Sequence, residues 1–142
     1  MTKRDFSKLL KVDMNSLIRE HFHFGTSMHG VLSSTTKDRT VMFSINSNEL
    51  RLIYLCNSYY FNTFVGQKIA LNWEIRKYGN TKAHFICPEC QKKTLALYYG
   101  GISFVCRKCT RDLHAIGLTD KKRDDKICSY MENGTIKTNV WI

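Results

Sequence analysis

The sequence predicts an α+β, β-rich fold that consists of an N-terminal helix, a small antiparallel sheet, a four-cysteine zinc ribbon and a C-terminal β-hairpin. Apolar residues recur at helical spacing near the N-terminus and alternate with polar residues from Thr40 onward, and two C-x-x-C pairs follow. A chain of 142 residues has about the length of one domain. We therefore expect residues 1–78 (helix and sheet), 79–118 (ribbon) and 119–142 (charged connector and hairpin) to form one compact unit.

The N-terminal helix is expected within residues 1–24, where six apolar side chains recur three or four positions apart. An alternative is a shorter helix over residues 14–22 with Asp13 as its N-cap. Residues 25–37 are rich in Ser, Thr and Gly and are expected to form a loop. Apolar and polar side chains then alternate in residues 41–46, 50–55 and 68–76, which predicts an antiparallel sheet between residues 41 and 76, with residues 57–66 expected to form a loop.

The C-terminal hairpin is predicted from two alternating segments that flank Asn133-Gly134. Asn-Gly between such segments is the strongest short-range signal of a β-hairpin. The charge-rich residues 119–126 that precede it are expected to connect the hairpin to the ribbon.

Four of the six cysteines have the spacing of a metal site, C-x₂-C-x₁₅-C-x₂-C. A two-residue spacer lets both thiolates of a pair face one ion, and a hairpin of fifteen residues would return the second pair to the first. Because four thiolates leave no coordination position for water, we expect one structural zinc ion without a catalytic role. An iron site, a redox dithiol and disulfides are the alternatives. The predicted ligands are Cys87, Cys90, Cys106 and Cys109.

The fifteen residues between the two pairs also predict how the ribbon packs. Apolar and polar residues alternate on both sides of Gly100-Gly101, which predicts a β-hairpin with its turn at these glycines. Adjacent strand residues face opposite ways, so we expect one of Tyr98 and Tyr99 to be buried. The ribbon is expected to pack on the sheet through Phe85, Leu95, Leu97 and Phe104.

The segments around the cysteines resemble a group of uncharacterised bacterial zinc-ribbon proteins that often occur in mobile or phage-derived DNA. The residues that carry the resemblance are F-I-C-P-E-C-Q-K-K at 85–93, L-Y-Y-G-G at 97–101 and F-V-C-R-K-C-T at 104–110. Gln91 departs from the pattern, in which a glycine follows the first pair. The resemblance implies zinc ligation by the same four cysteines and an origin in a mobile element or phage, but it implies no activity.

The net charge of +10 is concentrated around the cysteines. Residues 76–123 hold eleven basic and three acidic side chains, a net charge of +8, whereas residues 1–75 carry +3 and residues 124–142 carry −1. Such a field favours a polyanion, so we expect the ribbon face to bind nucleic acid at phosphate. The opposing interpretation is that these cations offset the thiolates or keep the surface soluble. The candidate phosphate contacts are Lys82, Lys92, Lys93, Arg107, Lys108 and Arg111.

Two other functions stay open on the sequence alone. A protein-interaction or inhibitor module would dock on a larger host or phage nucleoprotein complex. A metal-dependent enzyme would need further ligands, and His21 and His23 are the candidates. No paired carboxylate or nucleophile–base arrangement accompanies them, so we expect no enzymatic activity. The sequence has no run of eighteen apolar residues and no secretory signal, which predicts a cytoplasmic protein without a membrane partner.

Overall fold

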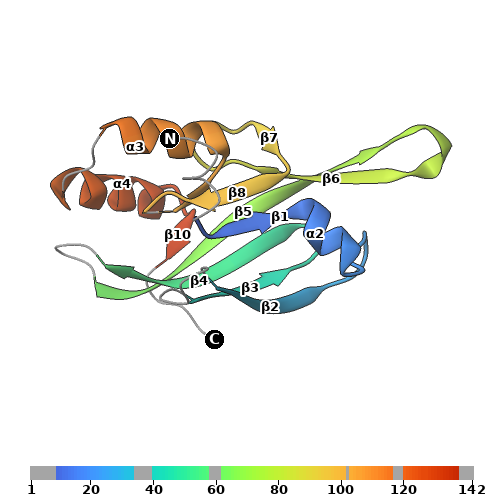
Figure 1. The fold of residues 1–142 in the computed structure, drawn as a ribbon, viewed down its shortest axis with the longest axis horizontal. Coiled ribbons are helices and arrows are strands. Elements are labelled where there is room, and N and C mark those ends of the chain that lie inside the picture. The colour runs from blue at the N-terminus through green and yellow to red at the C-terminus, as the bar shows by residue number, and fades with distance from the viewer. Residues whose placement is uncertain (1–8, 34–39, 58–61, 102, 117–119, 138–142) are drawn as a thin grey trace.

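The computed structural model describes residues 9–33, 40–57, 62–101, 103–116 and 120–137. Its larger layer is a curled antiparallel sheet of seven strands (Figure 1). These strands are β2 (Met28–Ser33), β3 (Thr40–Ile45), β4 (Glu49–Asn57), β5 (Asn62–Ile75), β6 (Thr81–Ile86), β7 (Lys93–Thr94) and β10 (Ile136–Lys137). The strand order is β2-β3-β4-β5-β6-β7, and β10 also pairs with β5.

The longest strand, β5, joins two parts of the large sheet. Its first nine residues pair with β4, and its last five pair with β6. Val65, Gln67 and Ile69 are buried, whereas Lys68 and Ala70 between and beyond them are exposed. The period-two alternation of the sequence therefore gives β5 one core face and one solvent face.

A smaller sheet packs on the core face of the large one. It consists of β1 (Lys11–Asp13), β8 (Ala96–Tyr99) and β9 (Phe104–Val105), in the order β1-β8-β9. Tyr54 of β4 makes edge-to-face ring contacts with Tyr99 and Phe104 of this sheet, at centroid distances of 5.4 and 5.7 Å. The buried Gln67 amide accepts the Phe104 N–H at 2.9 Å and donates to the Phe104 carbonyl at 3.1 Å, so it replaces a strand partner for β9.

The helical elements are α2 (Met14–Arg19), the short 3-10 turn η1 (Lys77–Gly79), α3 (Arg107–Ile116) and α4 (Asp120–Glu132). Asp13 caps α2 by accepting the Asn15 N–H at 3.2 Å. Met14 and Leu17 of this helix are buried in the core. Among the described residues, no helix combines the length and the apolar character needed to cross a membrane.

The predicted packing of the ribbon on the sheet is confirmed. Phe85, Leu97 and Phe104 are fully buried in the main core, and Leu95 is partly buried against it. Tyr99 is buried and Tyr98 is half-buried, as the alternation along β8 predicted. The turn of the β8–β9 hairpin includes Gly100 and Gly101, and Gly101 has a φ of +97°.

The predicted α+β fold class is wrong, because the described chain is mostly β-strand in a curled antiparallel sheet. The predicted C-terminal hairpin is also wrong, since the structure has α4 in place of its first strand, and part of the predicted charged connector forms the first turns of this helix. Residues 138–142 of the predicted second strand lie outside the described residues. Ile127 and Tyr130 lie three residues apart and are buried on one face of this helix. Asn133-Gly134 ends the helix rather than turning a hairpin. The Gly134 N–H donates to the Met131 carbonyl at 3.2 Å and the Thr135 N–H to the Tyr130 carbonyl at 2.9 Å, which is a Schellman cap.

The N-terminal half also differs from the prediction. The described part of residues 1–24 holds β1 and only six helical residues, so the shorter alternative capped by Asp13 is correct in its start, although the helix ends at Arg19. The sheet is not small, because β2, β6, β7 and β10 extend it beyond residues 41–76. Residues 28–33 were expected in a loop but form the edge strand β2, whose half-buried residues alternate with exposed ones. Residues 62–66 were also expected in a loop but form the start of β5, whereas residues 58–61 of that predicted loop lie outside the described residues.

Candidate metal centre

The first cysteine pair lies in a tight turn between β6 and β7. The Cys87 N–H donates to the Lys92 carbonyl at 3.0 Å, and the Gln91 N–H donates to the Cys87 carbonyl at 2.8 Å. These two bonds fold the chain back so that both thiols of the pair lie on its inner side. Gln91 closes the turn with a φ of +62°, a left-handed conformation in which glycine is favoured. Its side-chain amide donates to the Pro88 carbonyl at 3.0 Å.

The second pair is not a second knuckle, as the ribbon prediction required, but the junction of β9 and α3. Cys106 immediately precedes the helix and Cys109 lies in its first turn. Helical residues three apart share a face, so the same C-x₂-C spacing directs both thiols to one side. The Thr110 N–H and hydroxyl both donate to the Cys106 carbonyl at 2.9 Å and fix this junction.

The four thiols converge with the dimensions of a tetrahedral metal site. The Sγ atoms of Cys87 and Cys109 are 3.9 Å apart, those of Cys90 and Cys106 are 3.7 Å apart, and all four lie within 4.8 Å of one another. A tetrahedron with metal–sulfur bonds of about 2.3 Å has edges of about 3.8 Å. A disulfide would need about 2.05 Å, and all four cysteines are free thiols. The donor set therefore fits one metal ion.

The surroundings of the thiols favour a bound cation. Burial raises the pKa of the Cys87 and Cys109 thiols. Burial opposes ionisation of Cys90 too, but the Lys92 backbone N–H and the neighbouring thiols together lower the pKa of Cys90. The Cys106 N–H donates to the Cys87 sulfur at 3.3 Å. Because buried thiolates need a compensating charge, a divalent cation is what would hold all four deprotonated together.

Glu89, which lies between the two cysteines of the first pair, connects the metal centre to α4. Its carboxylate accepts Lys126 Nζ at 2.7 Å and the Tyr130 hydroxyl at 2.5 Å. Partial burial opposes ionisation of Glu89, but these two donors lower its pKa. Burial, followed by the contact with Glu89, raises the pKa of Tyr130. Glu89 is therefore kept as a carboxylate, which accepts the hydrogen bond, and Tyr130 is kept as a protonated hydroxyl, which donates it.

The six predicted phosphate contacts fall into two groups around the centre. Lys92 follows the first cysteine pair, and Arg107, Lys108 and Arg111 lie on the first turns of α3; all four side chains are exposed. Lys82 of β6 and Lys93 of β7 lie instead beside Glu74. Lys93 forms an ion pair with Glu74 at 2.6 Å, and Lys82 is the strand partner of Glu74.

Sequence reasoning missed Glu74 and Glu89 as partners of this region. The acid in C-P-E-C was visible, but Lys126 and Tyr130 follow it by about forty residues, and only the docking of α4 brings them to it. Lys93 and Glu74 are 19 residues apart and meet because β7 and β5 flank β6. No spacing rule in a single sequence identifies such pairs.

The histidines do not form a second metal site in the described part of the chain. His21 and His23 are both exposed, and His23 Nδ1 lies 3.2 Å from the Phe24 carbonyl. Within the described residues, the four cysteines are the one group of three or more potential ligands. The ligands expected for a metal-dependent enzyme are therefore not assembled there.

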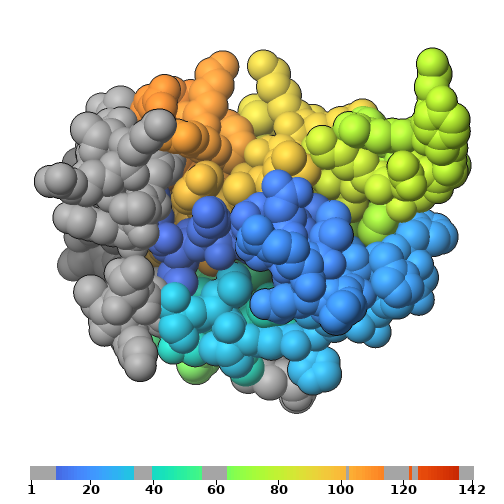
Figure 2. Space-filling view, turned by 45° about the vertical axis from the view of Figure 1, so that its right-hand side comes forward, coloured from blue at the N-terminus to red at the C-terminus, as the bar shows by residue number. Residues whose placement is uncertain are grey.

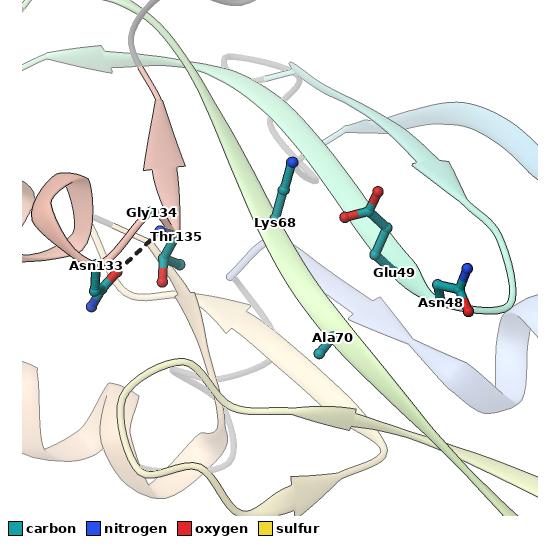
Figure 3. A pocket seen from close by; sticks show the side chains of 7 residues that line it. All are labelled: Asn48, Glu49, Lys68, Ala70, Asn133, Gly134 and Thr135. Carbon is teal, nitrogen blue, oxygen red and sulfur yellow. Dashed lines mark hydrogen bonds between the residues drawn. The ribbon is translucent and has the colours of Figure 1, made fainter.

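A polar hollow lies elsewhere, between the β3–β4 turn, β5 and the end of α4 (Figure 3). It has a volume of about 460 Å³ and opens widely to solvent. Asn133 Oδ1 accepts the Thr135 N–H at 3.0 Å, and Glu49 is paired with Arg51 at 2.8 Å, so these polar groups already serve local structure. We assign this hollow no function. Its lining residues are Asn48, Glu49, Lys68, Ala70, Asn133, Gly134 and Thr135.

Comparison of the chain with protein-family models, with curated proteins and with solved structures finds no match. The resemblance to bacterial zinc-ribbon proteins therefore stays a prediction.

Proposed function

We propose that the four cysteines hold one structural zinc ion and that the basic surface beside it binds nucleic acid at phosphate. Four thiolates at tetrahedral spacing are a donor set typical of structural zinc sites, and they leave no open coordination position. The ion would cross-link the β6–β7 turn to the start of α3 and neutralise part of the thiolate charge. We define the basic surface as Lys92, Arg107, Lys108 and Arg111.

The observation that carries the proposal is the position of these cations relative to the ligands. Lys92 follows Cys90 by two residues, and Arg107 and Lys108 lie between Cys106 and Cys109. Since the Sγ atoms of Cys90 and Cys106 lie 3.7 Å apart, an ion that fixes them also fixes the backbone of both segments. A phosphate contact at such positions orders little additional chain, which favours binding.

The charge balance also supports a net positive surface. Four thiolates and one Zn²⁺ carry a formal charge of −2, which the neighbouring cations exceed. Lys93 is engaged by Glu74, so we expect the ion pair to reduce the contribution of Lys93 to binding. Phosphate contacts of this kind read no base sequence, so we expect affinity without sequence specificity.

The experiment is a salt titration of binding to single-stranded and duplex oligonucleotides, followed by fluorescence anisotropy. A surface that neutralises about four to six phosphates should lose roughly two to three decades of affinity between 50 and 200 mM salt. A variant with Lys92→Gln and Lys108→Gln should reduce the slope of log affinity against log salt by about two.

The matched control carries Lys68→Gln and Lys137→Gln, which remove the same charge from exposed positions on β5 and β10. This control should keep the slope of the unmodified protein, and both variants should keep their full metal content. The proposal is contradicted if no probe binds at 50 mM salt, or if the two double variants weaken binding equally.

A further inference from the structure

The β5–β6 hairpin extends past the rest of the sheet as a two-stranded arm (Figure 1). The pairing of β5 with β4 ends at Ala70, whereas its pairing with β6 continues to Ile75. Trp73 anchors the base of the arm, because its Nε1 donates to the Ser47 carbonyl at 2.7 Å and its ring contacts Phe22 and Phe24. The arm therefore has a fixed base and a projecting end.

The end of the arm exposes apolar side chains. We define the tip as residues 75–79. Ile75 is 83% exposed and Tyr78 is 97% exposed, more than any other large hydrophobic residue that the structure describes. Tyr78 has a φ of +68°, which is unfavourable for a residue with a side chain, and in this tip its ring points to solvent. Packing inside the described molecule therefore does not explain the aromatic residue.

The tip is also positively charged. Arg76 and Lys77 lie between Ile75 and Tyr78, and residues 75–82 contain no acid. Glu74, the preceding residue, is neutralised by Lys93. Among the described residues no ion pair engages Arg76 or Lys77.

The tip lies on the same edge of the molecule as the basic surface. In Figures 1 and 2, α3 (orange), the segment around β7 (yellow) and the hairpin (lime) follow one another along this edge. Lys93 and Lys82, both at Glu74, lie between the metal centre and the tip. One extended strand could therefore contact both regions.

We propose that the tip is a stacking arm for single-stranded nucleic acid. The Tyr78 ring stacks on an unpaired base, Ile75 packs beside it, and Arg76 and Lys77 contact the flanking phosphates. Every base has a π-face, and it is accessible to an aromatic side chain where the strand is unpaired. This inference rests on the proposed function, because the basic surface would hold the same strand.

The charge of the tip is the reason to choose nucleic acid over an apolar protein pocket. Two cations within two residues of the aromatic ring complement a backbone that carries phosphates on both sides of each base, and Glu74, the acid that precedes the tip, is paired with Lys93. An anionic membrane surface offers the same charge but no face on which a ring stacks, and the test below separates the two.

The experiment measures binding of single-stranded 15-nucleotide DNA and RNA that contain 2-aminopurine. Tyr78→Ala should weaken binding roughly 5- to 150-fold, the range for one aromatic–base stack, without changing the slope against salt. Tyr78→Trp should restore affinity, and it should quench 2-aminopurine fluorescence as the unmodified protein does. The matched control is Phe64→Ala, because Phe64 is a 53% exposed aromatic residue near the other end of β5, about 35 Å along the strand from Ile75.

The inference is overturned if Tyr78→Ala binds as tightly as the unmodified protein, or if Phe64→Ala loses as much affinity. It is also overturned if Tyr78→Ala loses binding to phosphatidylserine vesicles but keeps its affinity for oligonucleotides. If Lys92→Gln and Lys108→Gln still change the salt slope but Tyr78→Ala does not change the affinity, the stacking arm is rejected and the proposed function stands. If the unmodified protein binds no oligonucleotide, both are rejected.

Discussion

Among the residues that the structure describes, the core between the two sheets contains twenty-one buried apolar residues, whereas the cluster around the candidate metal centre contains five buried residues, three of which are cysteines. The first cluster includes large side chains from nearly every strand, such as Tyr54, Phe85 and Phe104. The second has Val105 and Leu113 as its only buried non-cysteine members among the described residues. Burial of apolar area can hold the first cluster together, whereas the described residues of the second bury little such area, so we expect the second cluster to depend on the metal.

The difference indicates two sources of stability in one chain. The sheets are organised by alternating apolar residues, and their stability should fall when a substitution leaves a cavity in the core. We propose that a metal ion held by the four cysteines organises the β6–β7 turn and α3, and the stability of these segments should then depend on the metal. Glu89 joins the two regions because α4 packs Ile127 and Tyr130 into the main core while it binds the metal-centre turn.

The largest effect is expected from removing one ligand. Cys106→Ser should abolish metal binding and disorder α3, because a structural zinc ion contributes about 10–16 kcal/mol of binding free energy in small sites. Elemental analysis and circular dichroism of the purified variant measure both effects. Cys128→Ser, at an exposed thiol on α4, is the matched control and should keep one equivalent of metal. Retention of a full equivalent by Cys106→Ser would contradict the assigned ligand set.

A cavity in the main core should have a smaller effect of a different kind. Leu52→Ala removes a fully buried side chain and should reduce the free energy of unfolding by about 2–5 kcal/mol. Its metal content should not change, since Leu52 is not part of the metal cluster. Urea denaturation compares it with Leu55→Ala, at a 38% exposed position on the same strand, which should cost less than about 1 kcal/mol. Loss of metal from the Leu52 variant would show that the two regions are not separable.

Loss of the Glu89 contact, which connects the two regions, should have a smaller effect on stability than the Leu52 cavity. Glu89→Gln removes the charge that Lys126 and Tyr130 contact, and should reduce the free energy of unfolding by about 1–3 kcal/mol. Increased proteolysis at α4 should accompany this loss. Glu132→Gln, an exposed residue at the end of the same helix, is the control. Equal stability of the two variants would mean that Glu89 does not hold α4 on the metal centre.

The smallest effect is expected at Gln91. Gln91→Gly relieves a left-handed φ of +62° but loses the hydrogen bond to Pro88, so we expect a stabilisation of at most about 1 kcal/mol. Gln91→Val should destabilise the turn and weaken metal binding, because a β-branched residue tolerates positive φ poorly. Competition with a zinc-binding dye orders the three affinities. An order in which valine equals or exceeds glycine would show that the backbone of the turn is not strained.

The parts that the sequence predicted are those with local signals. The two C-x-x-C pairs are sufficient to identify the ligands, and alternation identifies much of β3, β4 and β5. The end of α4 was mispredicted because Asn133-Gly134 suits a hairpin turn and a helix cap equally well, since both need a residue with positive φ. Alternation of Ile127, Ser129 and Met131 agreed with a strand, whereas in the structure Ile127 and Tyr130 are buried and Ser129 is exposed, which is the pattern of a helix.

The parts that the sequence did not predict depend on contacts between distant segments. β1 pairs with β8, which lies more than eighty residues later in the sequence. Its three residues form a strand because of this distant partner, and so short a segment does not predict one by its own sequence. The burial of Gln67 was not predicted either, because it depends on the hydrogen bonds between its side-chain amide and the distant Phe104 backbone. The second cysteine pair was assigned to a knuckle because C-x₂-C gives the same thiol geometry in a turn and in the first turn of a helix.

We expect the metal to order the β6–β7 turn and α3, whereas the sheet core should not need it. Hydrogen exchange of the metal-bound and chelator-treated protein, read segment by segment by mass spectrometry, tests this most directly. We predict that removal of the metal abolishes protection in residues 87–92 and in α3, reduces it in α4, and leaves β3, β4 and β5 protected. Protection of α3 that survives metal removal, or a loss that spreads equally through β3, β4 and β5, would contradict the claim.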